Sequence, residues 1–175
     1  MRRVRLGLIL LAVLAVAVAA AVVAWRLRPS PARVSIYLVR VNPATQQGEL
    51  VPVTRDVPRG DARSLVAAAM EELLRGPSAP ERAGGLVSEI PEGTRLRGVT
   101  VKDGVAFVDL SRRVERGGGA FSVQARLWQI VYTATQLPDA PRARLIIEGE
   151  AKETFTGEGL MIDGPLARPQ VPPRL

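Results

Sequence analysis

The chain has 175 residues and contains neither cysteine nor histidine, which excludes a disulfide framework, a thiolate nucleophile, a His-dependent triad and the usual zinc ligands. The net charge of +7 is concentrated near the N-terminus, because five arginines flank one apolar run there and residues 29–175 carry only 7 − 5 = +2. This nearly neutral remainder does not favour nucleic acid as a partner. A hydrophobic content of 47% with 16 Gly and 14 Pro is typical of a folded domain rather than a disordered chain.

The N-terminal apolar run, residues 6–25, contains no charged residue. As a helix it spans roughly 30 Å, the thickness of the hydrocarbon core of a bilayer. Arginines at positions 2, 3 and 5 precede it, and positively charged residues tend to stay in the cytoplasm. We therefore expect a cytoplasmic stub at residues 1–5 and a single transmembrane helix at residues 6–25. The rest of the chain would then lie on the extracytoplasmic side of the membrane.

A cleaved signal peptide is the alternative for this segment. Ala17-Val18-Ala19 and Ala19-Ala20-Ala21 both have the small-x-small pattern of a cleavage site, and cleavage would release a secreted domain. The apolar run is longer than a typical signal-peptide core, and Trp25-Arg26 follows it directly. We therefore favour the uncleaved anchor.

The part of the chain after the anchor divides by composition. Residues 26–33 form a short Pro-rich linker, residues 34–163 are long enough for one domain with one core, and residues 164–175 form a Pro-rich tail that we expect to be irregular. Periodicity within the domain predicts five strands and two amphipathic helices. The strands are expected at residues 34–41, 50–57, 96–101, 105–110 and 144–148, and the helices at 62–75 and 123–136.

Local signals support these elements. Asp61 and Ser122 are predicted N-caps of the two helices, and Asp103-Gly104 predicts a tight hairpin between the third and fourth strands. Pro52 indicates that the second strand lies at a sheet edge or starts later, whereas the fourth strand is apolar on both faces and should be central. The order β-β-α-β-β-α-β predicts an α+β domain with two helices packed on a mostly antiparallel sheet.

Seven short segments between residues 35 and 150 resemble the GerMN domain, the sporulation and spore-germination module of bacterial envelope proteins, and occur in its order. They are Ile36-Tyr37-Leu38; Arg55; Leu73-Leu74-Arg75-Gly76-Pro77; Ile90-Pro91-Glu92-Gly93-Thr94; Val101-Lys102-Asp103-Gly104-Val105-Ala106-Phe107-Val108-Asp109-Leu110-Ser111; Gln129-Ile130-Val131-Tyr132-Thr133-Ala134-Thr135; and Glu148-Gly149. The resemblance implies an extracytoplasmic, non-catalytic role in a membrane-anchored or lipid-anchored protein.

Carboxylates near the end of the fourth strand are the candidates for chemistry. Asp109 could pair with Glu89, Glu92 or Glu148 as an acid and base for glycan cleavage. The simpler interpretation, which we favour, is that Asp109 and Ser111 accept hydrogen bonds from the loop backbone where the strand ends. Gly117-Gly118-Gly119 lacks the Gly-Lys-Ser/Thr of a nucleotide loop and is interpreted as a connection rather than an anion site.

Trp128 and Tyr132 are the candidate contact residues for a partner. They lie one turn apart on the flank of the second helix, away from its apolar stripe, and such aromatic residues are frequent binding hot spots. Alternatively, the loop at residues 78–89 or the C-terminal segment covers them.

The sequence thus predicts a membrane-anchored, non-catalytic domain that binds envelope proteins or peptidoglycan. It identifies no catalytic, cofactor-binding or metal-binding residue. A cell-wall glycan hydrolase using carboxylates and a self-assembling envelope scaffold are the alternatives.

Overall fold

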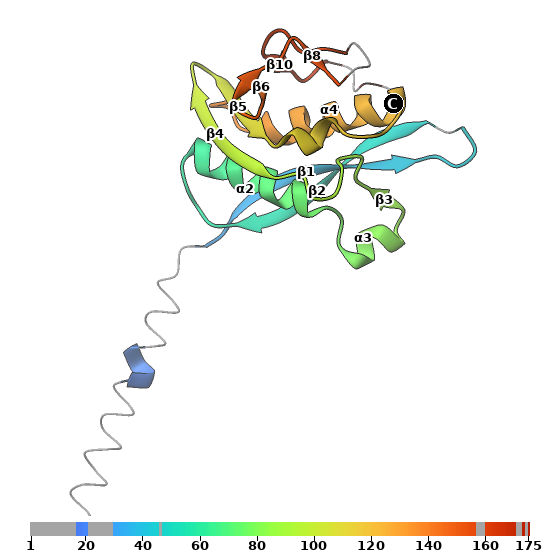
Figure 1. Ribbon diagram of the computed structural model, residues 1–175. Helices are drawn as coiled ribbons and strands as arrows, with labels where there is room; N and C mark the ends of the chain where they lie inside the picture. The colour runs from blue at the N-terminus through green and yellow to red at the C-terminus, as the bar shows by residue number, and fades with distance from the viewer. Residues whose placement is uncertain (1–16, 21–29, 46, 157–159, 171–172, 174) are drawn as a thin grey trace, which may run out of the picture. The chain divides into compact units, whose positions relative to one another are not determined.

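The computed structural model describes residues 17–20, 30–45, 47–156, 160–170, 173 and 175. The chain divides into two units, Met1–Ser30 and Pro31–Leu175, and the second contains the fold analysed below (Figure 1). Residues 17–20 are helical, but the rest of the predicted membrane segment at residues 6–25 lies outside the described residues. Among the residues that are described, no helix has the length and apolar character needed to cross a membrane.

A three-stranded antiparallel sheet in the order β2-β1-β3 forms one part of the domain; its strands are β1 (Ala32–Val41), β2 (Gly48–Val57) and β3 (Leu86–Val87). β1 and β2 pair along their full length, from Ala32 opposite Val57 to Val41 opposite Gly48. β2 lies at the edge, as Pro52 predicted, because an edge strand tolerates a residue without an N–H.

A second sheet contains five strands: β4 (Leu96–Lys102), β5 (Val105–Leu110), β6 (Arg142–Ile147), β7 (Glu150–Ala151) and β10 (Leu166–Ala167). β5 is central, between antiparallel β4 and parallel β6, which confirms the position predicted from its apolar faces. The predicted hairpin is also confirmed, since Asp103 and Gly104 have φ values of 52° and 74°, as a two-residue hairpin loop requires. A separate pair is formed by β8 (Thr154–Phe155) and β9 (Leu160–Met161).

The two long helices have the predicted character, but one begins earlier than predicted. α2 (Ala62–Arg75) has the predicted bounds, and the Asp61 side chain accepts a hydrogen bond of 2.8 Å from the Ser64 N–H. α4 (Ala120–Ala134) has Gly119 as its N-cap, so the prediction of Ser122 as the cap was wrong. Ser122 lies in the first turn, where its hydroxyl accepts a hydrogen bond from Arg126.

Both sheets and both long helices share one hydrophobic core. The predicted apolar stripe of α4 is buried in it, together with alternate residues of β1 and β6. The stripe comprises Val123, Leu127, Ile130, Val131 and Ala134; the strand residues are Ile36 and Leu38 from β1 and Leu145 and Ile147 from β6. The shared core and the two sheets confirm the α+β fold class.

Polar side chains of α4, and of Gln136 just beyond its C-terminal end, bond to β1 backbone groups that a neighbouring strand would otherwise pair with. The Gln136 side chain accepts a hydrogen bond from the Ser35 N–H and donates one to the Ser35 carbonyl, at 2.6 and 3.0 Å. Thr133 accepts from the Tyr37 N–H at 3.1 Å, and Gln129 donates to the Tyr37 carbonyl at 2.8 Å. The helix therefore satisfies backbone groups of β1 that β3 is too short to reach.

Three expectations need correction. The sheet is not continuous, because the strands pair in three separate groups: β2-β1-β3, β10-β6-β5-β4 with β7 on β6, and β8-β9. The predicted element order omitted short elements: α3 (Ala79–Ala83), the 3₁₀ turn η1 (Arg112–Glu115), β3 and the strands after Ile147. The tail is not wholly irregular, since β10 pairs with β6 and Leu175 exchanges two backbone hydrogen bonds with Gly48.

Candidate functional site

The two candidate aromatic residues on α4 belong to a cluster within the domain. Tyr132 is buried, with 7% of its surface exposed, and its ring lies edge-on to Tyr37 of β1 with centroids 5.1 Å apart. Trp128 is half-buried and packs edge-on against Tyr132 at 6.2 Å. Burial raises the pKa of the Tyr132 hydroxyl, although the nearby Arg168 opposes this shift. Trp128 therefore keeps an accessible part that Tyr132 lacks.

Arg168 from the C-terminal segment covers both tyrosines. Its guanidinium carbon lies 5.1 Å from the centroid of the Tyr37 ring and 5.1 Å from that of Tyr132. The guanidinium also donates hydrogen bonds to the Tyr37 hydroxyl, the Thr135 hydroxyl and the Tyr132 carbonyl. The C-terminal segment thus covers part of the aromatic pair, as one of the two alternatives from the sequence predicts.

Two of the four candidate carboxylates meet at a shared arginine. Arg97 lies 3.3 Å from Asp109 and 2.9 Å from Glu148, measured between side-chain nitrogen and oxygen atoms. Asp109 also accepts a hydrogen bond from the Gly149 N–H, and Glu148 accepts one from the Arg112 N–H. Ser111 accepts from the Arg95 N–H at 3.0 Å. The interpretation of Asp109 and Ser111 as backbone acceptors at a strand end is therefore correct.

The turn that carries Glu148 depends on these contacts. Glu148 and Gly149 form the two-residue loop between β6 and β7, with φ values of 54° and 82°. A positive φ is uncommon for a residue with a side chain, and the bonds from Glu148 to Arg97 and to the Arg112 N–H hold it in that conformation. This gives Glu148 a structural role.

The other two candidate residues, Glu89 and Glu92, accept side-chain hydrogen bonds through their backbone carbonyls rather than through their carboxylates. The Glu89 carbonyl accepts a hydrogen bond from Arg126, and the Glu92 carbonyl accepts one from Arg113, both at 2.9 Å. Neither carboxylate has a hydrogen bond or ion pair within the described residues. In the same part of the chain, no group of three or more acidic residues is arranged to hold a metal ion.

Arg126 is a structural residue that the sequence analysis missed. It is 1% exposed and donates to the carbonyls of Glu89, Val114 and Gly117 and to the Ser122 hydroxyl. Burial lowers the pKa of its guanidinium, and the nearby Glu89 opposes that shift. The Gly-rich segment thus offers a carbonyl to a cation, the opposite of an anion cradle.

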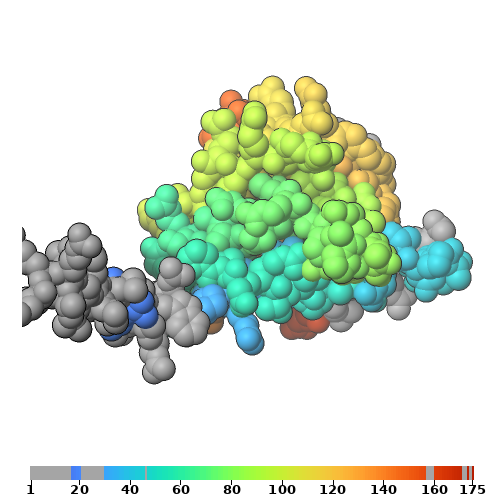
Figure 2. Space-filling model, turned by 90° about the horizontal axis from the view of Figure 1, so that it is seen from below, coloured from blue at the N-terminus to red at the C-terminus, as the bar shows by residue number. Residues whose placement is uncertain are grey.

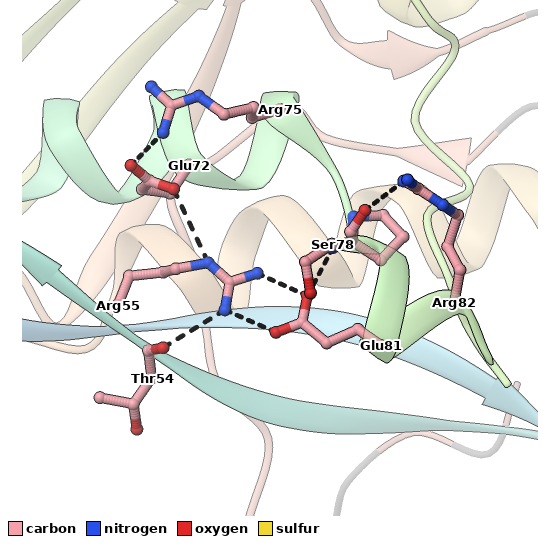
Figure 3. A network of polar contacts seen from close by, with 8 residues as sticks. Thr54, Arg55, Glu72, Arg75, Ser78, Glu81 and Arg82 are labelled. Carbon is pink, nitrogen blue, oxygen red and sulfur yellow. Dashed lines mark hydrogen bonds and ion pairs between the residues drawn. The ribbon is translucent and has the colours of Figure 1, made fainter. Parts of the chain in front are cut away.

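A polar network joins β2, α2 and α3 on one face of the domain (Figure 3). Arg55 makes two hydrogen bonds of 2.7 Å to the two carboxylate oxygens of Glu81 and lies 3.7 Å from Glu72, which also pairs with Arg75. Glu81 in turn accepts a hydrogen bond from the Ser78 N–H and closes the N-terminal cap of α3. The Arg55 guanidinium lowers the pKa of Glu81 to about 2. Figure 2 shows this face, with the residues of β2, α2 and α3 (teal to green) next to one another at the surface.

The family comparison covers most of the segment that this geometry describes. Residues 35–153 match the model of the Germane family, described as sporulation and spore germination. The chain belongs to this family. No curated protein matches the chain.

Solved structures show the same fold at low identity. The tandem GerMN domains of the sporulation protein GerM from Bacillus subtilis are 24% identical, with a TM-score of 0.62 over 80% of this chain and 46% of that one. The first GerMN domain of the same protein is 21% identical, with a TM-score of 0.61 over 78% of this chain and 98% of that one. A structure named "Putative Lipoprotein from Clostridium perfringens" is 22% identical, with a TM-score of 0.56 over 79% of this chain and 89% of that one. The chain thus spans about half of the tandem structure.

Three of the segments that resemble the GerMN family meet at one end of the five-stranded sheet. Ser111 at the end of β5 donates its N–H to the Arg95 carbonyl and accepts the Arg95 N–H on its hydroxyl. Glu148 donates its N–H to the Leu110 carbonyl. Residues near positions 93, 111 and 148, which are far apart in the sequence, therefore form one surface of this GerMN domain.

Proposed function

We propose that this protein is a membrane-anchored, extracytoplasmic and non-catalytic binding module of the bacterial envelope. Its partners would be envelope proteins or peptidoglycan, as expected for a GerMN-type module. Membership of a sporulation and germination family supports the type of module. The similarity in fold to a structure named as a lipoprotein supports an envelope location.

The arrangement of Arg97, Asp109 and Glu148 carries the non-catalytic part of the proposal. A glycosidase needs one carboxyl group free to donate a proton and a second free to act as nucleophile or base. Asp109 and Glu148 share one guanidinium and each also accepts a backbone N–H, so the oxygens of both side chains are already engaged as hydrogen-bond acceptors within the domain. This geometry suits the fixing of a turn rather than proton transfer.

The proposal of a membrane anchor is supported by the amino-acid sequence. An uncharged run at residues 6–25 between arginines fits an inserted helix with the N-terminus in the cytoplasm. The Pro-rich linker that follows is short, so the domain would act close to the outer face of the membrane. Trp128 is the proposed contact residue, because it is the member of the α4 aromatic pair with accessible surface.

A crosslinking pull-down from intact cells tests the proposal, with the full chain carrying a short C-terminal tag as bait. We expect defined envelope proteins or cell-wall fragments with a full-length bait, absent from a control bait that has only residues 1–33 and the tag. Trp128→Ala should reduce recovery, whereas Met161→Ala, which removes another exposed apolar side chain, should not. A bait that is recovered shortened would show that the N-terminal segment is cleaved, which would overturn the proposed anchor. Recovery of the same partners by the full and control baits would overturn the proposed binding function of the domain.

The hydrolase alternative has its own measurement. Purified protein incubated with cell-wall glycan should release no soluble fragments, and Asp109→Asn should give the same trace. Fragment release that disappears in Asp109→Asn would show that the carboxylates are catalytic.

A further inference from the structure

A concave surface rich in arginine lies where the three segments that resemble the GerMN family meet, near residues 93, 111 and 148. The pocket has a volume of about 470 Å³ and is lined by Gly93, Arg95, Ser111, Arg112, Arg113, Arg116 and Glu148. Volumes of this size are typical of small-ligand sites. The lining contains four guanidinium groups and one carboxylate, and no aliphatic or aromatic side chain.

The arginines of this pocket differ from the others in the domain. Within the described residues, arginines elsewhere are engaged: they pair with carboxylates, as Arg55 does, or donate to carbonyls, as Arg126 does. The guanidinium groups of Arg95, Arg112 and Arg116 make neither a hydrogen bond nor an ion pair with any other described residue. These three groups all line the same pocket. Lys152, which pairs with Glu150 at 2.6 Å, lowers the pKa of that carboxylate, and Arg112 is also near enough to lower it. Folding therefore leaves their donors available at one place.

The backbone around the pocket is held in place by hydrogen bonds. Ser111 and Arg95 exchange two of them, and the Arg112 N–H donates to Glu148 at 2.9 Å. The turn η1 then places Arg112 and Arg113 at the start of one short segment and Arg116 directly after it. Arg113 is fixed further, because its Nε donates to the Glu92 carbonyl at 2.9 Å. The backbone that bears the four arginines is thus fixed by these hydrogen bonds.

The one carboxylate of the lining does not neutralise the cluster. Both oxygens of Glu148 are already engaged, one by the Arg112 N–H and the other by the Arg97 side chain at 2.9 Å. Because Arg97 also pairs with Asp109, the three side chains Arg97, Asp109 and Glu148 together carry one net negative charge. The four arginines of the lining carry a charge of +4, so the pocket keeps a net positive charge of 4 − 1 = +3.

We propose that this pocket binds a phosphate group. A phosphate presents several oxygen acceptors and up to two negative charges, which suits several guanidinium groups better than a single carboxylate does. The lining contains no aliphatic or aromatic side chain, and its four guanidinium groups supply charge-assisted donors. The ligand is therefore recognised by its charge, as in a phospholipid headgroup or a soluble phosphate ester. This inference does not depend on which protein partner the module has.

The test is titration of the full chain, purified in a non-ionic detergent, with inorganic pyrophosphate followed by calorimetry. The pocket variant is Arg112→Gln with Arg116→Gln. The matched control is Arg33→Gln with Arg40→Gln, which removes the same charge from exposed ion pairs outside the pocket. We expect saturable binding that weakens at least tenfold in the pocket variant and less than twofold in the control. Lysine at both pocket positions should restore binding only in part, because lysine keeps the charge without the planar fork.

Competition then distinguishes the two sources of phosphate. Displacement of pyrophosphate by micelles containing phosphatidylglycerol, but not by phosphatidylcholine, would assign the site to an anionic lipid headgroup. Displacement by soluble glycerol phosphate alone would assign it to a soluble phosphate ester. Equal weakening in the pocket and control variants would reduce the effect to net charge and overturn the proposal, as would the absence of saturable binding. Circular dichroism verifies that each variant is folded.

Discussion

Trp128 and Tyr132 lie one helical turn apart on α4 but differ in how much of each side chain the domain covers. Tyr132 is 7% exposed and contacts both Tyr37 and Arg168, whereas Trp128 is half-buried and forms an edge-type ring contact with Tyr132. Removing the tyrosine leaves a cavity lined by another ring and an arginine. Removing the Trp128 side chain mainly exposes to solvent the part of Tyr132 that it covers.

We therefore predict that Tyr132→Ala lowers the free energy of unfolding by about 3 kcal/mol and Trp128→Ala by about 1 kcal/mol. For a domain of this size, these losses correspond to falls in Tm of about 9 °C and about 3 °C, which thermal unfolding followed by circular dichroism measures. Tyr132→Phe is the control, because it keeps the ring. An equal loss for both alanine variants would make Trp128 a packing residue and remove it as a contact for partners.

Roles of single residues could be predicted where the local backbone determines them. Asp109 and Ser111 follow a strand, where short polar side chains commonly accept backbone N–H groups, and they do so here. Arg126 could not be predicted in the same way. Its burial depends on carbonyls from two segments, Val114 and Gly117 before its own helix and Glu89 far away in the sequence, so the residues next to it do not indicate its role.

Among the elements, α3 is the one that depends most on an ion pair. This five-residue helix has no buried residue, and Glu81 in its first turn joins it to Arg55 of β2. Paired carboxylates of this kind stabilise a fold only while they are ionised. The Arg55–Glu81 contact therefore makes the docking of α3 dependent on pH.

We predict that this contact is lost in acid. The pKa of Glu81 falls from an ordinary 4.5 to about 2, so its contribution is complete above pH 4.5 and disappears as the pH falls toward 2. The full shift corresponds to about 3 kcal/mol, and we expect about 1–2 kcal/mol because the 19% exposed side chain is partly screened by solvent. Urea unfolding of the native chain and Glu81→Gln should differ by this amount at pH 6 and converge near pH 2.

The control for this prediction is Glu49→Gln. Glu49 also pairs with an arginine, but 66% of its side chain is exposed and the Arg40 contact is 3.4 Å long. Its removal should change stability by less than about 0.5 kcal/mol at any pH. A difference between native and Glu81→Gln that persists unchanged at pH 2 would contradict the assignment to the ionised carboxylate.

Length and periodicity decide which elements could be predicted. α2, β1, β2, β4 and β5 are long enough to show an apolar face, and their predicted positions differ from the observed ones by a few residues at most. The two-residue strands β3, β7, β8, β9 and β10 have no periodicity and exist because a partner strand pairs with them. The bonds to β1 from Gln129 and Thr133 of α4 were also missed, because a helical pattern does not indicate which backbone its polar residues will meet.

At the scale of the whole domain, the C-terminal segment connects the two sheets. β10 pairs with β6 of the five-stranded sheet, through Leu166 opposite Ala143 and Ala167 opposite Arg142. The next residue, Arg168, reaches Tyr37 of β1 in the other sheet, and Leu175 bonds to Gly48 of β2. Composition alone predicted an irregular tail, since prolines discourage regular structure without excluding contacts between it and the rest of the chain.

We predict that ending the chain after Gly164 destabilises the entire domain rather than only its C-terminal part. The truncation removes the β10–β6 pairing, the Arg168 contacts with two aromatic rings and the Gly48–Leu175 bonds. Together these contacts correspond to about 2–4 kcal/mol, or a fall in Tm of about 6–12 °C, measured by calorimetry on the full chain and the truncated one. Arg168→Ala should account for about half of the loss, because it removes the contacts with both tyrosines and leaves β10 in place. Since the segment joins both sheets, unfolding should remain a single transition with a lower midpoint; two separate transitions would show that the sheets unfold independently and that the segment does not couple them.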